Sequence, residues 1–248
     1  MKRVWEFLGY LAVVATLLGV SFTTLLNEPQ KAWTALALVA LTIIFICFQV
    51  YRLVNSQLKN QHPSGFLPLS CFMRYVTSDG SNIVYEVFRH LQIKSSCTGH
   101  FTHQFHWSGS KSPRIESDIQ EVGKIFTTPG ETTNFIKLKF KKAKIYNDVE
   151  VIHLKMNLDD SDKKSGTFLE QNVHAPITFI AFKVELLHAQ ASYFGKQATL
   201  SRKDMKKGDR AAIEEIDKYP FDVNSKSFSC NLTDPEPGYA YRLDWDRP

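Results

Sequence analysis

Hydrophobic residues are concentrated in two uncharged runs near the N-terminus. The runs cover residues 7–26 and 32–51, and only the short segment 27–31 separates them. Each contains about 20 residues, and a helix of that length, at roughly 1.5 Å per residue, spans the ~30 Å hydrocarbon core of a bilayer. The pattern predicts two transmembrane helices that form a hairpin, within an anchor made by residues 1–55.

The basic residues that flank these runs predict their orientation. Lys2 and Arg3 precede the first run, Arg52 and Lys59 follow the second, and Lys31 lies between them. Cytoplasmic segments next to transmembrane helices carry an excess of Lys and Arg. We therefore expect both termini to be cytoplasmic, as in a multi-pass protein of a cell inner membrane.

The rest of the chain contains short stretches of β-type composition that turn residues separate. Residues 56–70 include two prolines and a glycine and show no regular period, which predicts a linker. Residues 227–232 and 239–245, joined by a Pro- and Gly-containing segment, predict a hairpin because the second alternates apolar and polar positions. Further strands are predicted over residues 83–93, 99–107, 134–140, 149–157 and 176–187.

One short helix is expected among these strands. Asp209 is a suitable N-cap, Ile213 and Ile216 lie on one helical face, and Pro220 would end the helix. Seven or eight strands with one short helix predict that residues 71–248 form a cytoplasmic, mainly-β domain, either a sandwich or a small barrel.

Three histidines, His100, His103 and His106, are the residues that first suggest a metal site. They lie in a segment that alternates as a strand does, so His103 faces one side while His100 and His106 face the other. We therefore expect no metal site. The sequence also lacks a nucleophile elbow, a phosphate-binding loop, a dinucleotide fingerprint and a zinc-peptidase motif. This pattern predicts a protein that is not an enzyme and needs no cofactor.

Two groups of basic residues are candidate binding surfaces. Lys137, Lys139 and Lys141 alternate with apolar residues, which predicts a strand with one lysine face. Such a face suits a phosphate, a nucleotide or anionic lipid headgroups, or it protects the edge of a sheet from aggregation. The second group precedes the predicted helix and suits anionic lipid headgroups; it comprises Arg202, Lys203, Lys206, Lys207 and Arg210.

Nucleic acid is not an expected partner. The net charge is only +5 over 248 residues. A protein that binds a duplex is expected to carry a far more basic surface.

The layout of two apolar runs, 7–26 and 32–51, followed by a strand-rich domain resembles the two-transmembrane, β-strand-rich effectors of bacterial antiphage signalling systems. The resemblance implies that the β domain receives a cyclic nucleotide and that the membrane segments assemble as a homo-oligomer and damage the inner membrane. It rests on the layout and on no short motif, so it assigns no binding residues. The alternative is a membrane-tethered adaptor that holds a protein partner and has no ligand-gated activity.

Overall fold

The computed structural model describes residues 29–127 and 134–248. The chain divides into two compact units, Met1–Gln57 and Leu58–Pro248. The described part of the first unit is a single helix, α2, which spans Pro29–Gln61 and thus ends within the second unit. The second unit consists mainly of β-strands.

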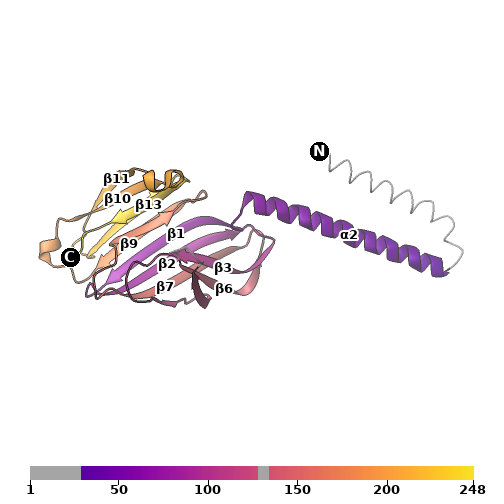
Figure 1. The fold of residues 1–248 in the computed structure, drawn as a ribbon, viewed down its shortest axis with the longest axis horizontal. Helices are drawn as coiled ribbons and strands as arrows, with labels where there is room; N and C mark the ends of the chain where they lie inside the picture. The colour runs from indigo at the N-terminus through magenta and orange to yellow at the C-terminus, as the bar shows by residue number, and fades with distance from the viewer. Residues whose placement is uncertain (1–28, 128–133) are drawn as a thin grey trace. The chain divides into compact units, whose positions relative to one another are not determined.

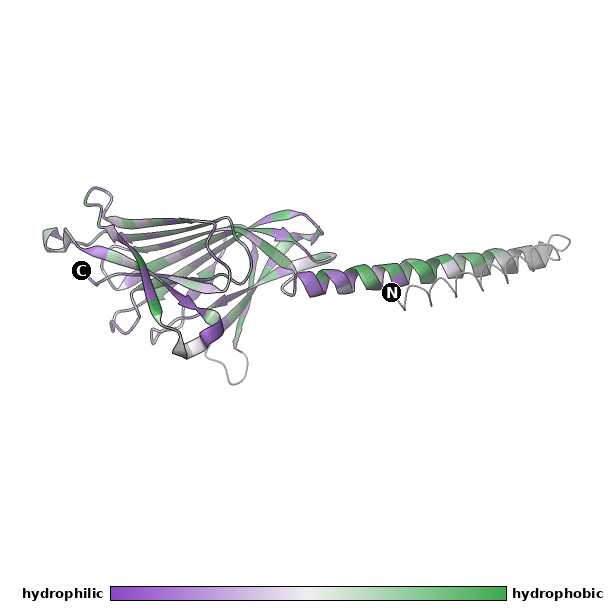
Figure 2. Ribbon diagram, turned by 90° about the horizontal axis from the view of Figure 1, so that it is seen from above, coloured by the Kyte–Doolittle hydropathy of each residue, from purple (hydrophilic) through white to green (hydrophobic). Residues whose placement is uncertain are grey.

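Helix α2 carries large apolar side chains on its surface. Leu41, Ile44 and Phe45 are about three-fifths exposed. Figure 2 shows the helix as hydrophobic over most of its length and hydrophilic towards its C-terminal end. Its segment Val39–Gln61 is long and apolar enough to cross a bilayer, as judged by length and composition.

The predicted two-helix hairpin is not supported. The first predicted span, residues 7–26, lies outside the described residues, and the described chain contains one helix of membrane-spanning length. That helix does not end near Tyr51 as expected, because no proline or glycine lies between Tyr51 and Gln61 to stop it. The prediction of a multi-pass inner-membrane protein with both termini in the cytoplasm is therefore corrected to one candidate span.

The segment expected to be a linker, residues 56–70, begins as helix and ends as strand. Helix α2 continues to Gln61, and strand β1 begins at Phe66. Between them, Gly65 adopts a positive φ of 75° and its N–H donates to the His62 carbonyl at 2.8 Å. A tight turn over residues 62–65 therefore replaces the expected irregular connection.

In the part of the chain that the structure describes, thirteen strands form three sheets (Figure 1). Sheet A contains, in spatial order, β12 (Ser227–Thr233), β9 (Phe179–Leu186), β1 (Phe66–Thr77), β2 (Asn82–Ile93), β7 (Val149–Asp159) and β4 (Arg114–Glu116). Sheet B contains β3 (Cys97–Phe105), β6 (Asn134–Ile145) and β5 (Glu121–Thr127). Sheet C contains β11 (Ile213–Pro220), β10 (Gln197–Asp204), β13 (Tyr239–Asp244) and β8 (Phe168–Asn172). Strands β1 and β9 are parallel neighbours, and the other paired strands are antiparallel.

The inner faces of the three sheets share one hydrophobic core. Phe66 of sheet A packs edge-on against Phe101 of sheet B, with ring centroids 5.2 Å apart. Tyr75 of sheet A packs in the same way against Trp245, which follows β13 of sheet C, at 4.9 Å. Sheet A therefore faces sheets B and C, as in a sandwich. The predicted β-rich, sandwich-type character of this region is confirmed.

The predicted C-terminal hairpin is wrong, although both of its strands exist. Strand β12 pairs with β9 in sheet A, whereas β13 pairs with β10 and β8 in sheet C. The segment between them passes from one layer of the sandwich to the other. Alternation along the sequence therefore located the strands, and long-range contacts decided their partners.

The predicted short helix after Asp209 is also wrong. Residues Met205–Arg210 form a 3-10 segment, η2, and the expected helical residues belong to strand β11. This strand pairs antiparallel with β10, where Ile213 lies opposite Lys203 and Pro220 opposite Gln197. The spacing of the two isoleucines resembles a helical stripe, but pairing with β10 provides the backbone hydrogen bonds.

Candidate ligand-binding sites

The lysine row lies on strand β6, which is the central strand of sheet B. Lys137 and Lys139 are exposed, whereas the alternating Ile136 and Leu138 are buried. Lys141 is also exposed. Because β3 and β5 flank β6 on both sides over residues 134–139, Lys137 and Lys139 do not protect a sheet edge, whereas Lys141 lies beyond the pairing with β5.

Contacts within sheet B already occupy part of this lysine row. The Lys139 ammonium lies 2.5 Å from the Glu121 carboxylate. Lys137 Nζ lies 5.9 Å from the centre of the Phe126 ring, within the range of a cation–π contact. A ligand at this face would have to compete with Glu121, so the lysine row is the weaker candidate for an anion site.

The second basic group is divided between β10 and η2. Arg202 donates to Glu214 at 2.7 Å and to Glu236 at 3.3 Å, and its guanidinium lies 4.6 Å from the Tyr239 ring centre. Lys207 lies 3.7 Å from Asp204. Acidic partners thus offset much of the charge of this group. Its other members are Lys203 on β10, the exposed Lys206 on η2, and Arg210, whose side chain lies outside the described residues.

The three histidines differ in burial, as the alternation of the segment predicted. His103 is buried, and His100 and His106 are exposed. Burial lowers the pKa of His103 to about 3, with a smaller contribution from the charge of Arg89. Among the described residues, no group of three His, Cys, Asp or Glu side chains is arranged to hold a metal ion.

Arg89 occupies an unusual position on the inner face of sheet A. In the sheet it lies opposite Cys71 of β1 and Ile152 of β7, and both neighbours are buried in the core. Residues directly opposite one another in paired strands point to the same side of the sheet. The arginine side chain is therefore directed towards the interior of the sandwich.

The charge of this arginine acts on three titratable residues, and we call the group of four the Arg89 cluster: Cys71, Tyr85, Arg89 and His103. Burial raises the pKa of Cys71 and of Tyr85, and the positive charge of Arg89 opposes both shifts. The same charge lowers the pKa of His103, which belongs to sheet B. The cluster thus has three members on sheet A and one on sheet B.

The Arg89 guanidinium lacks a counter-charge in the described part of the chain. Its Nε atom is buried and has no hydrogen-bond partner. Arg89 as a whole is half-buried, and leaving a buried donor such as this Nε–H without a hydrogen-bond partner costs about 1–3 kcal/mol. The site thus contains an unmet requirement for an anion or another acceptor. Sequence reasoning missed this residue, although Arg89 shares the odd-numbered positions of the buried Val87 and Leu91.

Comparison with known proteins does not identify a family. No family model and no curated protein matches this chain. Among solved structures, an M1 zinc metallopeptidase from Deinococcus radiodurans aligns with a TM-score of 0.38 and 8% identity, covering 73% of this chain and 42% of that chain. Yeast LTA4 hydrolase aligns with a TM-score of 0.40 and 9% identity, covering 74% and 30%. Baculovirus P35 aligns with a TM-score of 0.37 and 7% identity, covering 74% and 98%.

This chain thus spans less than half the length of the two hydrolases. The low scores mean that these likenesses carry no functional argument.

Proposed function

We propose that the second unit is a receptor for a phosphate-bearing small molecule of the cyclic-nucleotide class, and that helix α2 attaches this sensor to a membrane. In this proposal the protein is a sensor or effector in antiviral defence and not an enzyme. The buried Nε–H of Arg89, which has no hydrogen-bond partner on the inner face of sheet A, is the observation that carries the proposal.

A phosphate group would satisfy the requirement that Arg89 leaves open. Arginine presents a planar set of N–H donors that binds two phosphate oxygens at once. Such charge-assisted hydrogen bonds gain strength in a site of low dielectric constant. The ligand would therefore provide an acceptor for the buried Nε–H.

The neighbours of Arg89 suit the rest of a nucleotide. Tyr85 offers an aromatic ring and a hydroxyl group, and its raised pKa keeps that hydroxyl protonated at neutral pH. With its pKa at about 3, His103 is a neutral imidazole at physiological pH, with one donor and one acceptor nitrogen. These groups match the mixed donors and acceptors of a base or a sugar.

Helix α2 supports the membrane part of the proposal. A helix with exposed apolar side chains along most of its length is unfavourable in water and favourable in lipid. Ligand binding would change the assembly of such anchors only if the ligand bound the assembled state more tightly. Homo-oligomerisation and its effect on the membrane are parts of the proposal that come from the resemblance to antiphage effectors.

An adaptor for a protein partner is the second candidate function, and strand β11 favours it. This strand lies at the edge of sheet C, with Ile213 70% exposed and Ile216 43% exposed. An exposed sheet edge with apolar side chains can accept an additional strand from another protein. This function needs no ligand at Arg89.

Replacement of Arg89 by Met tests the proposal. The full chain in detergent is titrated calorimetrically with cyclic mononucleotides and cyclic dinucleotides. We expect a nucleotide to bind the wild type and to bind Arg89→Met about 10- to 100-fold more weakly, because a hydrogen bond to a charged group contributes about 1.5–3 kcal/mol. Arg114→Met is the matched control, because Arg114 is exposed and pairs with Glu116 at 2.7 Å.

Absence of nucleotide binding by the folded wild type, or equal binding by Arg89→Met, would contradict the receptor function. Capture of a partner that is lost when β11 carries Ile213→Lys would then favour the adaptor.

A further inference from the structure

A pocket lies at the end of the sandwich where strand β1 finishes. The turn between β1 and β2, the segment between β7 and β8, the residues after β9 and the C-terminal residues all contribute to its wall. Its volume is about 130 Å³. A cavity of roughly 150 Å³ holds a benzene molecule, so a ligand of about half a dozen non-hydrogen atoms fits here.

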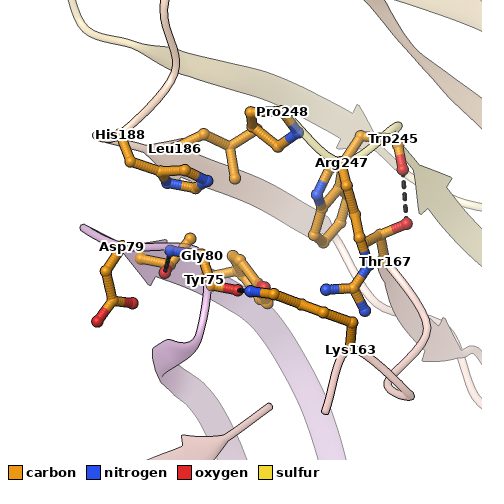
Figure 3. A pocket seen from close by; sticks show the side chains of 11 residues that line it. Tyr75, Asp79, Gly80, Lys163, Thr167, Leu186, His188, Trp245, Arg247 and Pro248 are labelled. Carbon is orange, nitrogen blue, oxygen red and sulfur yellow. Dashed lines mark hydrogen bonds between the residues drawn. The ribbon is translucent and has the colours of Figure 1, made fainter. Parts of the chain in front are cut away.

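Two cationic side chains, Lys163 and Arg247, lie on one side of this pocket, and His188 lies on the other (Figure 3). Lys163 donates to the Gly80 carbonyl and to Ser81 Oγ. Gly80 has a positive φ of 73°, and a Cβ atom there would lie 2.8 Å from His188 Nε2. The turn therefore requires glycine, which leaves space for the imidazole ring.

The guanidinium of Arg247 is held by two residues of the segment between β7 and β8. Its Nη1 donates to the buried Asp160 carboxylate at 2.8 Å, and its Nη2 contacts both oxygens of Ser165. These contacts hold the guanidinium in one position. A preorganised donor binds a ligand without the entropic cost of ordering a flexible side chain.

Both cations retain unused N–H groups. The Lys163 ammonium has three protons and two acceptors. The Arg247 guanidinium has five N–H groups, and its contacts use three of them. The Tyr75 hydroxyl lines the pocket, and burial raises its pKa to about 12, so it remains protonated at neutral pH.

Two side-chain carboxylates near the pocket, those of Asp160 and Asp79, already accept hydrogen bonds. Asp160 accepts from Arg247 and from the Ser165 N–H at 2.9 Å. The Asp79 carboxylate accepts from the N–H groups of Ser81 and Asn82 and from the Asn82 side chain. Figure 3 shows this carboxylate directed away from the pocket. These two carboxylates are thus engaged, whereas Lys163 and Arg247 retain free N–H groups.

We propose that this pocket binds a small oxyanion, either a phosphate or a carboxylate, through Lys163, Arg247 and Tyr75. The ring of Trp245 forms an apolar wall beside these donors. The site is separate from the Arg89 cluster, because it uses none of the same residues. A protein with both sites would respond to two ligands.

Tryptophan fluorescence provides the test, because Trp245 lines the pocket. The full chain in detergent is titrated with inorganic phosphate and, separately, with acetate. We expect at least one anion to give a saturable change in fluorescence that disappears in Trp245→Phe. Saturation by phosphate alone identifies a phosphate site. Saturation by acetate alone identifies a carboxylate site. Lys163→Met should weaken binding about 10-fold or more, and Tyr75→Phe by about 2- to 10-fold.

Two control variants test whether the response is specific to this pocket. Lys164→Met changes an exposed neighbour that does not line the pocket, and it should bind as the wild type does. Arg89→Met should also retain this response, so failure of the nucleotide proposal leaves this proposal standing. No saturable response to either anion, or wild-type binding by both Tyr75→Phe and a folded Lys163→Met, would overturn it.

Discussion

At the scale of single residues, two arginines on opposite faces of sheet A differ in their partners. Arg74 lies beside Glu185, with nitrogen–oxygen distances of 3.2 and 2.9 Å, and it also reaches Glu86 at 3.4 Å. Arg89 is directed to the opposite face and has no acid beside it in the described chain. Arg74 is therefore satisfied within the fold, whereas Arg89 has donors to offer to a ligand.

Glu185 provides a test of the satisfied pair. Its pKa is lowered mainly by the hydrogen bond from Arg74, with a further contribution from Lys183. We expect Glu185→Gln to reduce the free energy of unfolding at pH 7 by about 1 kcal/mol, since Arg74 is partly exposed and water screens the pair.

The pH dependence of this effect follows from the direction of the pKa shift. A carboxylate with a lowered pKa in the folded state stabilises the protein above its unfolded pKa of about 4.3, and this contribution is lost as the pH falls through the folded value. Urea unfolding at pH 7 and pH 3 should show a smaller difference between variant and wild type at pH 3. An equal difference at both values would contradict this assignment, and Glu215→Gln is the exposed control.

At the scale of elements, aromatic packing holds the edge strand β12 in sheet A. Phe228 of this strand is fully buried. Its ring lies 5.1 Å from that of Phe221 and 6.2 Å from that of Tyr193, measured between centroids. Ser229 on the same strand is exposed. The two faces of one short strand thus contribute very differently to stability.

We expect Phe228→Ala to reduce the free energy of unfolding by about 3–5 kcal/mol, because it leaves a cavity among aromatic rings. Ser229→Ala should change it by less than about 0.5 kcal/mol. Chemical denaturation of both variants measures the difference. A loss below about 1 kcal/mol for Phe228→Ala would mean that β12 is not held by this cluster.

At the scale of the whole molecule, α2 is the element expected to decide where the protein resides. Phe45→Arg places a charge within the candidate span Val39–Gln61, where insertion would cost about 2.5–3.5 kcal/mol. We expect a smaller fraction of this variant in membranes after alkaline extraction. Trp33→Arg adds the same charge outside that span and should have a smaller effect. Extraction of Phe45→Arg to the same extent as the wild type would contradict a membrane role for α2.

The sequence by itself determined the features that depend on local patterning. Stretches of β-type composition identified strands such as β2 and β7, and alternation placed His103 on the opposite face from His100 and His106. An uncharged apolar run identified the helix that contains the candidate span. These features follow from backbone geometry and from hydrophobic burial over a few neighbouring residues.

Only the tertiary structure decided which strands pair and which charges meet a partner. Residues 213–216 have the spacing of a helix, but pairing with β10 makes them a strand, and β12 and β13 separate into different sheets although they are close in sequence. The opposite states of Arg74 and Arg89 likewise depend on residues far away along the chain. Pairing and charge compensation require contacts between distant segments, and local periodicity carries no information about them.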